Sequence, residues 1–123
     1  MDYQGVLYFP DYAVCNCTPH PIRFKVGEDI VEVPPSGMTL AATPRETAAG
    51  GGDGYALVRT VFISSEKGEA EVSECEGRGI LPIGSIISAQ AWPGRVVSLV
   101  PVEGYERKPP AEKLYRCDKF NTF

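Results

Sequence analysis

A histidine between two prolines leads directly into an alternating segment, and this combination constrains the fold more than any other feature. Pro19 and Pro21 hold their own φ angles near about −65° and disfavour helical conformations at the residues before them. Residues 22–26 then alternate apolar and basic side chains, which is the period-two pattern of a half-buried strand. We therefore predict a stiff polar corner at residues 16–21 that feeds a β-strand.

The rest of the chain shows the same pattern of short strands and frequent turns. Its 123 residues include 13 glycines and 11 prolines, and no long stretch is rich in Ala, Leu, Glu and Lys. We predict a mainly β fold, a single small barrel or sandwich of about seven to nine short strands. At most one helical turn is expected, at residues 111–115, and a last edge strand at residues 117–120.

Residues 1–123 are expected to form one domain, because this length is typical of a single domain. Residues 43–54 contain a run of Ala and Gly that offers little to pack, so we predict a mobile Gly-rich loop there. The following residues 55–64 are apolar on both faces, which favours a central strand. The acidic residues 66–76 are interpreted as a solvated hairpin end, and residues 86–92 as another strand.

Charge and hydropathy exclude several classes of partner. The formal net charge is −4, which argues against duplex nucleic acid, since binding there depends on basic patches. The apolar runs are far shorter than the roughly 18 residues of a membrane span. The first residues lack the basic start and apolar region of a signal peptide, so we expect a cytoplasmic protein with no membrane partner.

Several short motifs occur in a characteristic order along the chain. They are Asn-Cys-Thr-Pro-His-Pro at residues 16–21, Pro-Ser-Gly at 35–37, Gly-Ile-Leu-Pro at 79–82, Ile-Ser at 87–88 and Tyr-Arg-Cys at 115–117. Together they resemble a family of small bacterial and phage proteins that usually read Asn-Leu-Thr-Pro-His near the N-terminus. Cys17 departs from the usual Leu, and Val96 begins a stretch without the acidic residue expected shortly after Arg95. The resemblance implies a compact phage-type protein and no settled activity.

Four cysteines are expected to be free thiols, because no export signal is evident. Cys15, Cys17 and His20 offer metal-ligand types close together, with Cys75 or Cys117 as a possible fourth. On a regular strand the Cys15 and Cys17 sulfurs would lie about 6–7 Å apart, too far for one metal unless the strand kinks. We therefore expect inert, buried thiols, with no metal and no cofactor.

His20 is the only histidine, so any Cys–His or Ser–His catalytic pair must use it. The chain contains no Gly-x-Ser-x-Gly elbow, and its Gly-rich segment lacks the Gly-Lys-Ser/Thr ending of a phosphate loop. We predict no catalytic residue and expect the imidazole to close the corner by hydrogen bonding. A small hydrolase that uses His20 as its base is a further alternative.

Three arginines fall in or beside predicted strands, where an inward-facing guanidinium can bind a carboxylate or a phosphate in bidentate fashion. Trp92 has a ring that can stack on a planar ligand. The predicted ligand-binding residues are therefore His20, Arg23, Arg59, Trp92 and Arg95. The alternative for each arginine is solvent exposure or pairing with a glutamate, and for Trp92 a place in the core.

Two classes of function follow from these observations. The first is a non-enzymatic binding protein that captures a small anionic metabolite or nucleotide, as a phage-type sequestering protein would. The second is a protein–protein interaction or self-assembly module that uses an exposed strand edge, with a protein partner or a homo-oligomer as the result.

Overall fold

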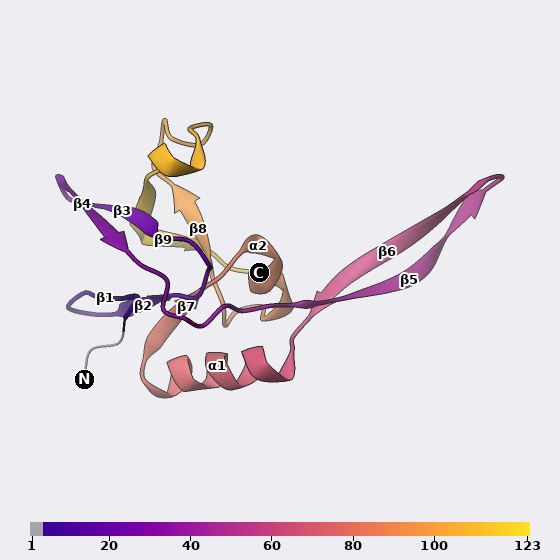
Figure 1. Cartoon of the computed structure of the whole chain (residues 1–123), viewed down its shortest axis with the longest axis horizontal. Coiled ribbons are helices and arrows are strands. Elements are labelled where there is room, and N and C mark those ends of the chain that lie inside the picture. Colours follow the sequence, from indigo (N-terminus) through magenta and orange to yellow (C-terminus); the bar gives the residue numbers. More distant parts are fainter. Residues whose placement is uncertain (1–3) are drawn as a thin grey trace.

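The computed structural model describes residues 4–123, which form mainly β-strands together with two α-helices and a short 3-10 helix, η1 (Figure 1). The aromatic and β-branched content of residues 3–9 also predicts a strand, and its first residue lies outside the described residues, as does part of the segment used to judge export. The strands are β1 (Val6–Tyr8), β2 (Ala13–Asn16), β3 (Ile22–Val26), β4 (Asp29–Val33), β5 (Thr43–Gly52), β6 (Tyr55–Ile63), β7 (Ile80–Ile83), β8 (Ser98–Pro101) and β9 (Tyr115–Asn121). The helices are α1 (Glu66–Gly77), α2 (Ile86–Ala91) and η1 (Pro110–Glu112).

The strands form three separate sheets. A three-stranded sheet has the order β1-β2-β7, in which β2 is antiparallel to β1 and parallel to β7. A four-stranded sheet has the order β4-β3-β9-β8, so β9 lies inside the sheet and not at the edge where it was expected. Within residues 4–123, β5 and β6 pair only with each other. The described strands close no barrel, and the expectation of a barrel is therefore wrong.

Strand β2 is buried along its whole length and contributes side chains to two apolar cores. Its odd-numbered residues enter what we call the helix-side core, which consists of Ala13, Cys15, Cys17, Leu40, Val72, Cys75, Ile80, Ala89, Trp92 and Val96. Val14 enters the sheet-side core with Ile22, Phe24, Val33, Ile83 and Val97. The alternation follows from the pleat of a strand, which directs successive side chains to opposite faces.

Helix α1 occupies residues that were interpreted as a solvated hairpin end, so the expectation of at most one helical turn is wrong. Its N-cap is Ser65, whose Oγ accepts a hydrogen bond from the Gly68 backbone N–H at 3.1 Å. Gly68, Val72 and Cys75 are buried and lie on one helix face, because residues three and four apart are neighbours there. A Cβ at Gly68 would lie 2.4 Å from the Trp92 ring, so this position requires glycine.

Helix α2 replaces the strand expected at residues 86–92. Ser85 caps it by accepting a hydrogen bond from the Ser88 backbone N–H at 3.1 Å. Ser88 is buried, and its hydroxyl donates to the Leu40 carbonyl at 2.6 Å. The 3-10 helix η1 lies close to the helical turn expected at residues 111–115. Among the described residues, no helix has both the length and the hydropathy to cross a membrane.

The polar corner that follows β2 is tied together by the side chain of Asn16, which is fully buried. Its Oδ1 accepts hydrogen bonds from the Thr18 backbone N–H at 3.0 Å and from the Thr18 hydroxyl at 2.6 Å. Its Nδ2 donates to the carbonyls of His20 at 2.8 Å and Val33 at 3.1 Å. His20 is exposed, and its described hydrogen bonds use its backbone. The Asn16 amide therefore makes the hydrogen bonds that close the corner, a role that we expected for the His20 imidazole.

We predict that Asn16→Ala lowers the free energy of unfolding by about 3 kcal/mol, because the Val33 carbonyl loses a buried donor and the Thr18 backbone N–H loses its acceptor. The control His20→Ala should change it by less than about 0.5 kcal/mol, as is usual for an exposed residue. Urea denaturation of both variants measures the two values. Equal losses in the two variants would contradict the assignment of the ties to Asn16.

Candidate functional site

Strands β5 and β6 project from the rest of the molecule as a long two-stranded ribbon, which we call the arm (Figure 1). Every residue from 43 to 61 is exposed, and only Phe62 and Ile63 near the base are partly buried. Residues 55–63 therefore form a strand as expected, but among the described strands it pairs with β5 alone, so the expectation of a central strand is wrong. The segment expected as a loop at residues 43–54 is mostly the second strand of the same ribbon.

The glycines near the tip of the arm allow its two strands to pair closely. The register shifts between Ala48 and Gly51, which marks a bulge in β5. Gly51 has a φ of +142°, and a Cβ there would lie 2.7 Å from the carbonyl oxygen of Tyr55. A larger residue would therefore force the strands apart. The mobility of this segment remains a prediction.

The arm exposes large apolar side chains on both of its faces. Tyr55 is 62% exposed, Leu57 and Val58 are each 53% exposed, and Val61 is 45% exposed. Side chains alternate along a strand, so Tyr55, Leu57 and Val61 share one face and Val58 lies on the other. Such side chains are the ones that a binding partner covers most favourably.

Apolar exposure continues from the arm onto the body of the protein. Helix α2 contacts β6 and presents Ile86 and Ile87 to solvent. The strand edges of the arm carry few charges, since β6 contains Arg59 as its one charged residue and β5 contains Arg45 and Glu46. Exposed edges in natural proteins are commonly protected by charge or proline. The strand residues of the distal half of the arm, 48–52 and 55–58, have neither, and Asp53 lies in the turn between the two strands.

Two of the five predicted ligand-binding residues lie together, where they clamp helix α1. Arg95 Nη1 donates to both carboxylate oxygens of Glu69 at 3.0 and 2.9 Å, and its Nη2 donates to Glu76 at 2.6 Å. Trp92 is buried, and its Nε1 donates to Glu69 at 3.0 Å. Arg95 lowers the pKa of both Glu69 and Glu76, while Glu76 and Glu69 raise the pKa of Arg95. This guanidinium is already bound to carboxylates of the chain itself.

The other three predicted residues lie elsewhere. Arg23 donates from Nη1 to the Ala111 carbonyl at 3.1 Å, Arg59 lies on the exposed arm, and His20 lies at the corner after β2. A hollow of about 310 Å³ contains none of the five predicted residues. Its lining residues are Lys25, Gly27, Val102, Glu103, Arg116, Cys117 and Asp118. The structure therefore does not gather the predicted residues into one pocket.

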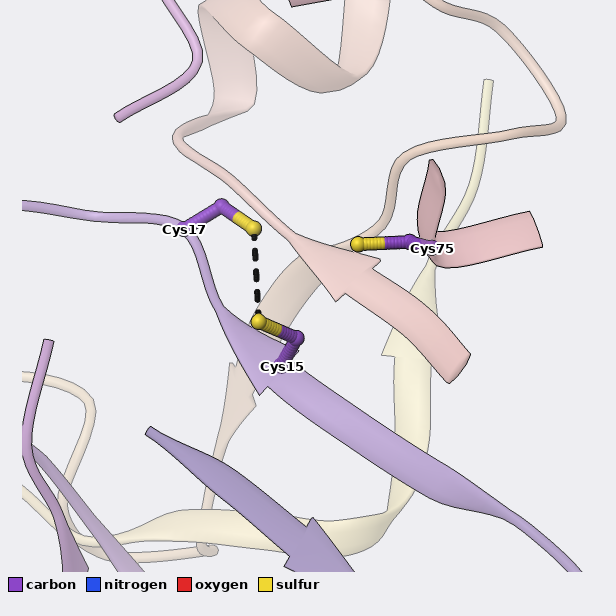
Figure 2. Close-up of side chains that lie close together, drawn as sticks. All are labelled: Cys15, Cys17 and Cys75. Carbon is purple, nitrogen blue, oxygen red and sulfur yellow. Dashed lines mark hydrogen bonds between the residues drawn. The ribbon is translucent and has the colours of Figure 1, made fainter. Parts of the chain in front are cut away.

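Three cysteines meet in the helix-side core, with side chains that point toward one another (Figure 2). The sulfurs of Cys15, Cys17 and Cys75 all lie within 4.8 Å of one another. The Cys17 thiol donates to the Cys15 sulfur at 3.7 Å. Strand β2 ends at Asn16, so Cys17 lies past the regular pleat and the expected separation of about 6–7 Å is wrong. Cys117 lies apart from them, on β9.

Contacts among these thiols shift their pKa values in opposite directions. Hydrogen bonds from Cys17 and then Cys75 lower the pKa of Cys15. The hydrogen bond with Cys15 raises the pKa of Cys17 and also that of Cys75, and burial acts in the same direction. Sequence reasoning considered Cys75 only as a possible partner, because nothing local indicates that α1 brings it to the end of β2.

Comparison of the chain with protein-family models, with curated proteins and with solved structures finds no match. The resemblance to the phage-type family therefore stays a prediction.

The clamp predicts a specific dependence of stability on pH. The pKa values of Glu69 and Glu76 are lowered from the usual 4.5, so their stabilisation is present above that pH and is lost as the pH falls through the lower folded-state values. In urea denaturation, the double variant Glu69→Gln and Glu76→Gln should be less stable than the natural chain at pH 7. The difference should shrink below pH 4.5. The control Glu28→Gln, in the turn between β3 and β4, should show the same dependence of stability on pH as the natural chain. A stability difference between the double variant and the natural chain that is the same at all pH values would contradict the clamp.

Proposed function

We propose that the protein is an interaction module that assembles with a second copy of itself through the arm. The observation that carries this proposal is the exposure of Tyr55, Leu57, Val58 and Val61 on a two-stranded ribbon that projects from the body.

Taken alone, the arm is a ribbon of low stability. A two-stranded hairpin without a third strand or a packed face is marginally stable in water. The arm has partly buried side chains only at its base, so its outer part gains little from the body. Full burial of one large apolar side chain contributes about 1.5–3 kcal/mol. Contact with a partner would therefore stabilise the arm as well as join the two molecules.

The edge of β6 suits pairing with an identical edge. The strand has nine residues, so it extends about 30 Å. Antiparallel pairing of two copies of β6 has two-fold symmetry, and each copy then receives the same backbone hydrogen bonds. The apolar residues of each strand would pack beside those of the other. Ile86 and Ile87 extend the same apolar surface toward the body.

Capture of a small anion has less support. Arg95 is bound to Glu69 and Glu76, Arg23 is bound to a backbone carbonyl, and Arg59 lies on the arm. These guanidinium groups do not converge on one hollow, which such capture would require.

The proposal predicts that the natural chain shows a mass that rises with concentration from monomer to dimer. The double variant Leu57→Glu and Val61→Glu should weaken self-association at least about tenfold, because burying two carboxylates opposes apolar contact. Sedimentation equilibrium measures both dissociation constants. The melting temperature of the body should change little, since both residues are exposed.

The matched control is Ile30→Glu, which changes a similarly exposed apolar residue on β4, outside the arm. It should leave the dissociation constant unchanged. A natural chain that stays monomeric at every concentration would reject self-assembly and leave a different protein as the partner. An equal effect of Ile30→Glu would reject the arm as the contact surface.

A further inference from the structure

We propose that Cys15, Cys17 and Cys75 form a binding site for a thiophilic divalent metal ion of the zinc class. This inference is independent of self-assembly, because the three cysteines lie in the helix-side core and not on the arm.

The spacing of the sulfurs fits a single ion. Zinc binds thiolate sulfur at about 2.3 Å, so two ligands of a tetrahedral zinc lie about 3.8 Å apart. The sulfurs of Cys15 and Cys17 are 3.7 Å apart, and all three lie within 4.8 Å of one another. A point equidistant from three such sulfurs lies within about 2.8 Å of each. Small rotations of the side chains therefore suffice to bind the ion.

The three ligands are held by elements that the fold fixes independently. Cys15 lies in β2, where it is paired with Pro82 of β7, and the Cys17 backbone N–H donates to the Ile83 carbonyl at 2.9 Å. Cys75 lies on the buried face of α1. Ligands on rigid elements keep their geometry before the metal arrives, which favours binding.

A fourth coordination position is available beside the cluster. A cavity of about 20 Å³, enough for one water molecule, is bounded by two of the three cysteines. Its lining residues are Val6, Cys15, Met38, Glu74, Cys75, Arg78 and Ile80. A water molecule there would complete a tetrahedral site, because the Glu74 carboxylate is already paired with Arg78 at 3.0 Å.

Charge selects a divalent ion over a monovalent one. Three thiolates with a divalent ion carry one net negative charge, whereas a monovalent ion would leave two in an apolar core. Arg78, which is paired with Glu74 at 3.0 Å, lines the same cavity. His20 is exposed and lies outside the cluster, so the site differs from the Cys-x-Cys-x-x-His arrangement that the sequence alone suggests.

The test starts from the full chain, reduced and stripped of metal with a chelator, and then titrated with zinc chloride. Elemental analysis after gel filtration should give one zinc per chain. Cys75→Ala should weaken zinc binding at least about 100-fold. The matched control Cys117→Ala, and His20→Ala, should each retain one zinc per chain. Loss of zinc in either control equal to that in Cys75→Ala would overturn the proposal.

A second measurement uses only the natural chain, in case Cys75→Ala fails to fold. Zinc should slow alkylation of Cys15, Cys17 and Cys75 at least tenfold, with the sites located by peptide mapping, while the rate at Cys117 stays the same. A natural chain that retains no stoichiometric zinc, or whose three core thiols react equally fast with and without it, would overturn the proposal.

Discussion

The buried amide of Asn16 is the constraint on which the rest of the body depends. It sits where β2 leaves the three-stranded sheet, and it binds the corner after β2 and the end of β4 with all of its polar atoms. A buried amide must be satisfied within the protein, so this arrangement fixes the path of the chain between the two sheets. The same turn moves Cys17 out of the pleat and toward Cys15. The thiol cluster is thus a consequence of the corner.

The body and the arm are stabilised in different ways. The body has two apolar cores that share β2, and each buries side chains from several elements. The arm has no core of its own, and its apolar residues face solvent on both sides (Figure 1). In water such a ribbon gains stability mainly from what it contacts. A thiophilic ion would strengthen the body, and a second copy would strengthen the arm.

Sequence periodicity predicted local structure well where a strand has one buried face. The strand predicted from the alternation at residues 22–26 is confirmed by β3. Helix α1 was missed because its buried face consists of Gly68, Val72 and Cys75, which include only one large apolar residue. Its signal was the N-cap Ser65 before an acidic first turn. The thiol cluster depends on a long-range contact, and the apolar pattern of β6 does not reveal whether another sheet or solvent covers it.

The central claim is that the arm pairs with another arm. Amide hydrogen exchange in β6, measured at two protein concentrations, tests it most directly, because pairing protects amides on the outer edge of that strand. We expect the outward-facing amides of β6 to exchange slowly when the protein is concentrated and much faster on dilution, while β2 stays protected at both concentrations. Exchange in β6 that is independent of concentration would contradict self-assembly through the arm.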